Sequence, residues 1–169
     1  MKNVFVDGYN VINSWPGLRD IIEYNLEAAR QKLIDILQNY AVYKGYKVFI
    51  VFDAHMKKGS LGNKEFFSGV VVIYTKEGET ADSYIEKAVN DIGRTTEVCV
   101  VTSDSLEQQL IFQRGAIRSS STEFYFEVKE VEGIIKTETE RSKAQKKYLL
   151  EDRMKKEVWE KLEKIRRNR

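Results

Sequence analysis

Three residue types are nearly absent from this chain: its 169 residues include one cysteine, one proline and one histidine. A single cysteine, Cys99, cannot form a disulfide within the chain, so a reducing compartment such as the cytoplasm is expected. No stretch approaches the roughly 18–20 consecutive apolar residues of a membrane-spanning helix. The N-terminal residues 1–7 reach a charge too early for a secretory signal. We therefore expect a cytoplasmic protein that does not enter a membrane.

Several motifs of nucleotide-binding and hydrolytic proteins are also missing. The chain has no Gly-x-x-x-x-Gly-Lys-Ser/Thr phosphate loop, no Gly-x-Gly-x-x-Gly fingerprint and no Gly-x-Ser-x-Gly nucleophile elbow. One cysteine and one histidine do not make a zinc cluster. An aspartyl-phosphatase pattern needs a second aspartate two residues after Asp7, and Tyr9 occupies that position. These absences argue against each of those chemistries.

Acidic and basic residues are distributed unevenly along the chain. Residues 1–136 contain 16 basic and 19 acidic side chains, whereas residues 137–169 contain 12 basic and 7 acidic, a net charge of +5. An acidic body with a basic extension is consistent with a cation site in the first part and a polyanion-binding element in the second. We expect one domain at 1–136 and a basic helical extension at 137–169, packed on the domain or on a partner. A solvated charged helix is the alternative for the extension.

Short apolar runs rich in valine and isoleucine alternate with segments of helical periodicity. The expected strands cover residues 3–7, 47–52, 69–75 and 97–102. The expected helices cover residues 23–43, 80–92, 104–114, 121–135 and about 142–167. Glycine and proline indicate a loop at 8–17, and polar residues with glycine indicate another at 55–63. This order predicts an α/β fold with a mostly parallel sheet of four to five strands flanked by helices, followed by a C-terminal basic amphipathic helix.

Four aspartates stand where the expected elements meet. Asp7, Asp53 and Asp104 each follow an apolar run. Asp82 lies at the start of the helix that is expected after a fourth apolar run. Ligands of an open parallel sheet bind beyond the carboxyl ends of its strands, so the four carboxylates are expected at one edge. Carboxylates that close repel each other unless a cation lies between them, and Mg²⁺ and Mn²⁺ take oxygen ligands. The pattern predicts metal-assisted chemistry on a phosphate.

Each aspartate also has a purely structural explanation. Asp7 and Asp53 suit turns at strand ends, while Asp82 and Asp104 suit the first turn or the N-cap of a helix. The occurrence of all four at one predicted edge favours a functional site.

Other residue types near that edge suit the same chemistry. Asn10 can fold back toward Asp7, and Ser103 precedes Asp104, so we expect both to position water or a phosphate oxygen. The role of His55 stays open between a general base, a phosphate ligand and a structural residue. Basic and aromatic side chains near the edge are candidates for binding a phosphate backbone or stacking on unpaired bases, although a solvated loop is the alternative for the lysines. They are Tyr9, Lys57, Lys58, Lys64, Arg114 and Arg118.

Four segments of the chain resemble those of the YacP-like NYN-domain proteins, which belong to the wider PIN-like nuclease group. They are Val-Asp-Gly-Tyr-Asn at 6–10, Phe-Asp-Ala-His at 52–55, Glu-Thr-Ala-Asp at 79–82 and Thr-Ser-Asp at 102–104. The resemblance implies a PIN-like, Rossmann-like three-layer fold and a metal-dependent endoribonuclease. It further implies a link to messenger RNA decay and to the ribosome.

The resemblance also implies roles for individual residues. Asp7, Asp82 and Asp104 are expected to hold Mg²⁺ or Mn²⁺, Asn10 to be the asparagine of the Asp-x-x-Asn element, and Asp53 to be an additional acid. The predicted function is hydrolysis of RNA phosphodiester bonds. Two alternatives are a non-catalytic RNA or ribosome-binding module with a relic acidic site, and a small-molecule phosphohydrolase.

Overall fold

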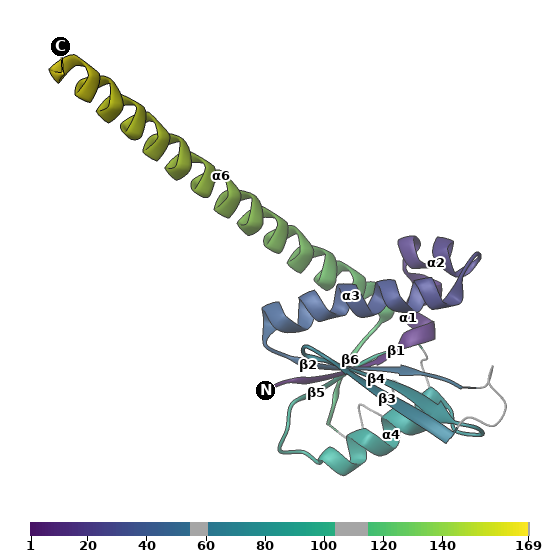
Figure 1. The fold of residues 1–169 in the computed structure, drawn as a ribbon. Coiled ribbons are helices and arrows are strands. Elements are labelled where there is room, and N and C mark those ends of the chain that lie inside the picture. Colours follow the sequence, from purple (N-terminus) through teal and green to yellow (C-terminus); the bar gives the residue numbers. More distant parts are fainter. Residues whose placement is uncertain (55–60, 104–114, 169) are drawn as a thin grey trace. The chain divides into compact units, whose positions relative to one another are not determined.

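One mostly parallel sheet organises the first part of the chain (Figure 1). The computed structural model describes residues 1–54, 61–103 and 115–168. Within these ranges six strands lie in the order β3-β4-β2-β1-β5-β6, and every neighbouring pair is parallel except β3 and β4. The strands are β1 (Asn3–Asp7), β2 (Lys47–Phe52), β3 (Leu61–Phe67), β4 (Val70–Lys76), β5 (Val98–Val101) and β6 (Ile117–Ser119). The predicted α/β class is confirmed, but the predicted strand number was too low.

The two missed strands, β3 and β6, are the edges of the sheet. An edge strand buries few side chains, so it need not carry an apolar pattern. β3 has the sequence Leu-Gly-Asn-Lys-Glu-Phe-Phe and is almost entirely exposed, and β6 is only 3 residues long. The loop expected at 55–63 therefore gives way to β3 from Leu61 onward, and Lys64 lies on this strand rather than on a loop. The expected helix at 104–114 lies outside the described residues.

Helices cover both faces of the sheet, which gives the expected three layers (Figure 1). The helices are α1 (Gly8–Ser14), α2 (Pro16–Ile22), α3 (Leu26–Lys44), α4 (Ala81–Ile92) and α6 (Ser121–Arg167). α4 packs Ala81, Ile85 and Val89 against one face of the sheet, where they join a buried cluster with Phe5 and Val51. α1 and α3 lie over the opposite face (Figure 1).

The prediction of a loop at 8–17 was wrong, because this segment forms α1 and the start of α2. The Asp7 side chain accepts a hydrogen bond from the Asn10 backbone N–H at 3.3 Å and so caps α1. Pro16 is the first residue of α2, a position that needs no backbone N–H. Gly8 is required by packing, since an added Cβ would lie 2.3 Å from the Phe52 ring. The glycine and the proline thus stand at helix starts, not in a loop.

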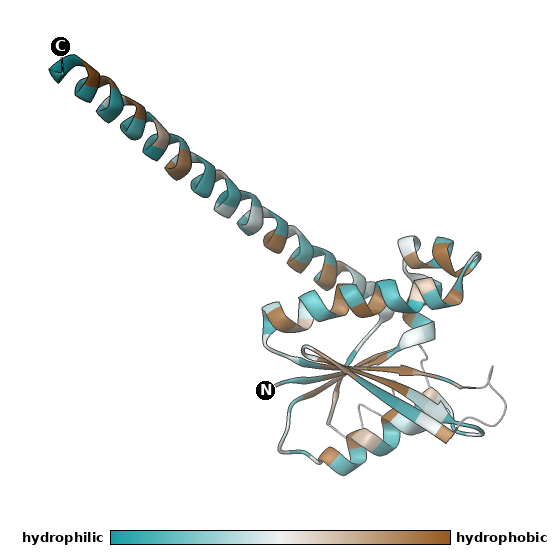
Figure 2. Cartoon of the chain, viewed as in Figure 1, coloured by the Kyte–Doolittle hydropathy of each residue, from teal (hydrophilic) through white to brown (hydrophobic). Residues whose placement is uncertain are grey.

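The chain divides into two compact units, Met1–Val131 and Glu132–Arg169. α6 supplies Phe124, Val128 and Val131 to the core of the first unit. The second unit is the remainder of α6, so one helix replaces the two that were predicted at 121–135 and 142–167. Apolar and polar residues alternate along it (Figure 2). In the part of the chain that the structure describes, no helix is both long and apolar enough to cross a membrane.

Substitution of two glycines tests the packing at the start of α1. Gly8→Ala forces a methyl group into the Phe52 ring, whereas Gly17→Ala meets no atom within 4 Å. We expect Gly8→Ala to lower the free energy of unfolding by about 2 kcal/mol or more, the range for overpacked cores. Gly17→Ala, in the helical α2, should be neutral or stabilising. Urea denaturation measures both, and equal midpoints for the two variants would contradict the proposed contact.

Candidate active site

Three of the four predicted acids come together at the carboxyl edge of the sheet. Asp7 ends β1 and is paired in register with Val51 of the neighbouring β2, so Asp53 follows two residues further along. Asp82 lies in the first turn of α4, after the N-cap Thr80. The charges of Asp82 and Asp53 both act on Asp7, and the Asp7 and Asp82 carboxyl groups are hydrogen-bonded. Asp104, the fourth predicted acid, lies outside the described residues.

The environment of Asp7 disfavours its charged form. The pKa of Asp7 rises from 3.8 to about 6: burial raises it most, the backbone N–H of Asn10 lowers it, and the negative charges of Asp82 and Asp53 raise it further. The hydrogen bond in which protonated Asp7 donates to Asp82 acts in the same upward direction. Two carboxylates this close need either a shared proton or a cation between them. The acid pair therefore has the chemistry of a site for a hard divalent cation.

A buried threonine holds two of the acid-bearing segments together. Thr75, near the end of β4, is only 1% exposed. Its Oγ1 accepts a hydrogen bond from the Ala54 N–H at 3.0 Å and donates one to the Glu79 carbonyl at 2.9 Å. Ala54 follows Asp53, and Glu79 lies three residues before Asp82. Thr75 was not among the predicted site residues. A polar residue within an apolar run, at a position expected to be buried, could have indicated it.

Asn10 and Ser103 make specific contacts within the chain. The Asn10 Oδ1 accepts a hydrogen bond from the Ser103 backbone N–H at 3.2 Å. The Ser103 hydroxyl is 2.6 Å from the hydroxyl of Ser121, whose carbonyl accepts from the Trp15 indole N–H at 2.9 Å. Since Ser103 follows β5 and Asn10 follows β1, these bonds hold the ends of two neighbouring strands to each other and to the start of α6. Both predicted residues thus lie at the acidic edge.

Three of the predicted RNA-binding residues lie within the described ranges, and they do not form one patch. Tyr9 lies in α1, where its hydroxyl accepts a hydrogen bond from Arg30 at 3.0 Å. Lys64 lies on β3 and Arg118 on β6, which are opposite edges of the sheet. Both side chains are exposed. Four further residues of the prediction lie outside the described ranges: His55, Lys57, Lys58 and Arg114.

The carboxyl pair lies at the carboxyl edge of a three-layer, mostly parallel sheet, an arrangement that is compatible with a PIN-like α/β domain. The family model of the YacP-like NYN domain matches residues 4–167. The chain therefore belongs to the YacP-like NYN-domain family, as its sequence motifs indicated. NYN domains form a PIN-like nuclease family, which supports a hydrolase that acts on RNA.

Relatives from one bacterium agree with this assignment. The uncharacterized protein YacP of Bacillus subtilis (strain 168) is 46% identical over 135 residues, which cover 78% of this chain and 78% of YacP. A crystal structure of Rae1 (YacP) from Bacillus subtilis superposes with a TM-score of 0.74 at 38% identity, covering 99% of this chain and 95% of that one. A crystal structure of a tryptophan-to-leucine mutant of Rae1 gives a TM-score of 0.70 at 40% identity, covering 81% of this chain and 80% of the mutant.

The raised pKa of Asp7 predicts how stability depends on pH in the absence of divalent cations. The folded-state pKa of about 6 exceeds the ordinary value of 3.8. Between about pH 4 and pH 6, Asp7 therefore carries a proton in the folded state but not in the unfolded state. Stability then falls as pH rises from about 4 to 6, and Asp7→Asn removes this loss. At pH 8 in EDTA we expect Asp7→Asn to unfold with a free energy about 2 kcal/mol higher than the parent protein. Asparagine can still cap α1.

Urea denaturation across pH 4–8 measures this effect. Asp91→Asn, which removes an exposed carboxylate from the last turns of α4, is the matched control. A pH profile of Asp7→Asn that runs parallel to the parent profile would show that Asp7 is not the responsible group.

Proposed function

We propose that this protein is a divalent-cation-dependent endoribonuclease that cleaves RNA phosphodiester bonds. The observation that carries the proposal is the hydrogen-bonded pair of Asp7 and Asp82, with Asp53 close enough to raise the pKa of Asp7 further. Membership of a PIN-like nuclease family supports RNA as the substrate. The absence of a zinc cluster, a phosphate loop and a nucleophile elbow from the sequence leaves the acids as the best candidates for chemistry.

Asp7, Asp82 and Asp104 would hold the cation, Mg²⁺ or Mn²⁺. PIN-like nuclease domains generally depend on divalent metals, and carboxylate oxygens suit these two ions. Within residues 1–54, 61–103 and 115–168, no group of three or more His, Cys, Asp or Glu side chains is arranged to hold a metal ion. Asp104 therefore completes the ligand set in this proposal. A cation held there would supply positive charge beside the scissile phosphate and promote attack by water.

The remaining residues position these groups. Asn10 orders the acidic edge, since its backbone N–H binds Asp7 and its side chain binds the Ser103 backbone. Ser103, which is exposed, is placed to contact a phosphate oxygen, and Asp53 extends the acidic edge toward the substrate. The lysines at 57, 58 and 64, with Tyr9, Arg114 and Arg118, would contact the RNA outside the reacting bond.

The proposed substrate is messenger RNA in association with the ribosome, in the cytoplasm. The resemblance to the YacP-like family implies this setting, and the net charge of +5 on residues 137–169 suits a phosphate-rich partner. A non-catalytic RNA or ribosome-binding module is the second candidate, because the basic extension alone would support binding.

Asparagine substitutions at the acid pair test the chemistry. Asp7→Asn and Asp82→Asn each keep side-chain size but remove a negative charge from the cation site. We expect each to reduce cleavage of a labelled RNA in Mg²⁺ by about 100-fold or more, as for the loss of one electrostatic group of an active site. Circular dichroism should show the fold retained. Asp91→Asn, with its exposed carboxylate, should cleave at the parent rate. Parent-level cleavage by Asp7→Asn would remove the main support for the proposal.

Removal of the cation separates catalysis from binding. With EDTA we expect cleavage to stop while RNA remains bound in a mobility-shift assay, and added Mg²⁺ or Mn²⁺ to restore it. Binding without cleavage, with and without ribosomes and under every metal condition, would favour the non-catalytic module. Rapid hydrolysis of nitrophenyl phosphate would instead indicate a small-molecule phosphohydrolase.

A further inference from the structure

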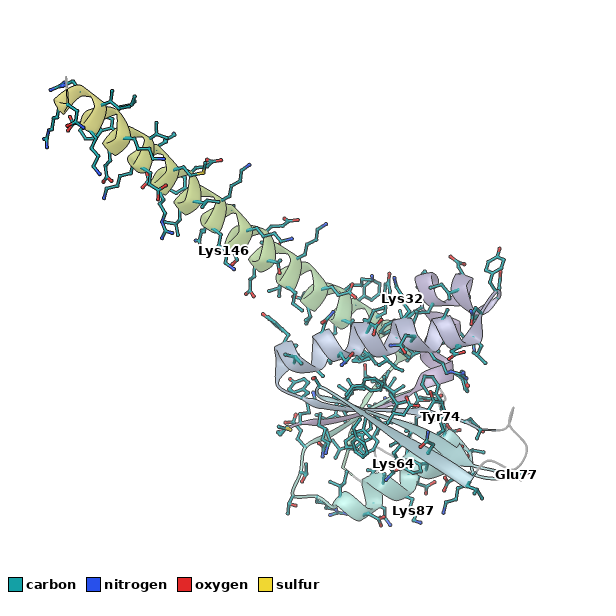
Figure 3. The ribbon with its side chains drawn as sticks, in the orientation of Figure 1. Lys32, Lys64, Tyr74, Glu77, Lys87 and Lys146 are labelled. Carbon is teal, nitrogen blue, oxygen red and sulfur yellow. The ribbon has the colours of Figure 1, made fainter. Side chains whose placement is uncertain are left out.

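A cleft of about 610 Å³ opens beside the acidic edge, on the face of the sheet that α3 covers. Its walls come from α1, α3, the end of β2, and the strands β3 and β4. Asn63 of β3 is opposite Tyr74 of β4 in register, and Glu65 is opposite the buried Val72. Figure 3 shows the position of Tyr74 on the sheet. The volume is within the range of small-molecule sites, roughly 300–1,000 Å³.

The cleft adjoins the proposed cation site. Asp53 lines the cleft, and its charge also acts on Asp7. Tyr9, two residues after Asp7, lines the cleft as well. A nucleotide whose phosphate lies at the acids would therefore have its base within reach of the cleft.

Flat side chains form one side of the cleft. The Tyr9 ring lies 5.0 Å from Phe52, and Phe52 lies 5.6 Å from Tyr74. The Arg30 guanidinium lies 5.9 Å from the centre of the Tyr74 ring and donates a hydrogen bond to the Tyr9 hydroxyl at 3.0 Å. Unpaired bases stack on aromatic rings and on arginine planes. Tyr9, Tyr74 and Arg30 line the cleft, whereas Phe52 is buried and does not line it, so the exposed parts of the first three side chains are the surfaces available to a base.

The charges of the cleft oppose a phosphate. Among the lining residues that the structure describes, Glu27, Glu65 and Asp53 are acidic and Arg30 is basic. Burial, and then the charge of Glu65, raises the pKa of Tyr74, so its hydroxyl keeps its proton at neutral pH. Carboxylates only accept hydrogen bonds, so the cleft favours a ligand that carries N–H donors and no negative charge.

We propose that this cleft binds an unpaired nucleobase next to the scissile phosphate and that it prefers guanine. Guanine presents two adjacent donors, N1–H and the 2-amino group, to a carboxylate such as Glu65. Uracil presents one N–H between two carbonyl oxygens, which the carboxylates repel. Adenine and cytosine, each with one amino group, fall between. The proposal rests on the proposed nuclease function for its place in the reaction, but base binding itself does not require cleavage.

Sequencing the ends produced from a random RNA pool tests the preference. We expect the parent protein to cut beside guanine at least roughly fivefold more often than beside uracil, as one good base contact provides. Glu65→Gln should reduce this ratio to below about twofold, and Glu27→Gln should reduce it independently. Glu130→Gln removes an exposed carboxylate of α6 and should leave the ratio unchanged. Identical base frequencies for the parent and for both cleft variants would overturn the proposal.

Titration of nucleotides tests the site without catalysis. GMP, UMP and inorganic phosphate are added separately to full-length Asp7→Asn in EDTA, and the NMR amide resonances of Asn63 and Glu65 are followed. We expect GMP to shift them and UMP and phosphate to have little effect. Shifts by GMP, together with a parent protein that cleaves no RNA in Mg²⁺ or Mn²⁺, would uphold the base site and refute the nuclease. Asp7-dependent cleavage with no shift and no base bias would refute the base site alone.

Discussion

The rest of this site depends on one constraint, the burial of the Asp7 carboxyl group beside Asp82. β1 ends at Asp7, and the same side chain caps α1. A negative charge buried there is unfavourable, and the neighbouring acids make it more so, which is why the pKa of Asp7 rises to about 6. A proton or a cation must offset this cost. The acid pair is thus unfavourable in its fully charged form, and we propose that a divalent ion offsets this cost.

Hydrogen bonds between distant segments fix the acids in place. Thr75 connects the residue after Asp53 to the turn that leads into Asp82. Asn10 connects the ends of β1 and β5. Each such bond contributes only about 1 kcal/mol on balance, but loss of one partner leaves a polar group unsatisfied and costs more. These two polar residues therefore determine the geometry of a site whose charges would otherwise push its segments apart.

In the proposals made above, the acidic edge and the adjoining cleft contact different parts of a nucleotide. The acids suit a phosphate only through a cation, and the described lining of the cleft, with three carboxylates and one arginine, suits a base with N–H donors. Asp53 lies at the boundary of the two. The second unit, Glu132–Arg169, has a net charge of +5, whereas the first unit, Met1–Val131, has a net charge of −3. In the proposed function, attraction of the RNA backbone and selection at the reacting nucleotide therefore belong to different residues.

By itself the sequence determined the buried elements and the acids that follow them. β1, β2, β4, β5, α3 and α4 were predictable, because buried segments must carry apolar residues at the period of their own geometry. The edge strands β3 and β6 bury too little to carry such a pattern. The order of the strands in the sheet could not be deduced from the sequence either. Only that order places Lys64 and Arg118 at opposite edges of the sheet. The bonds of Thr75, and the cleft between α3 and β3, likewise arose only in the folded chain. Periodicity is local, whereas proximity depends on which strands pair, and this is decided by packing over the whole domain.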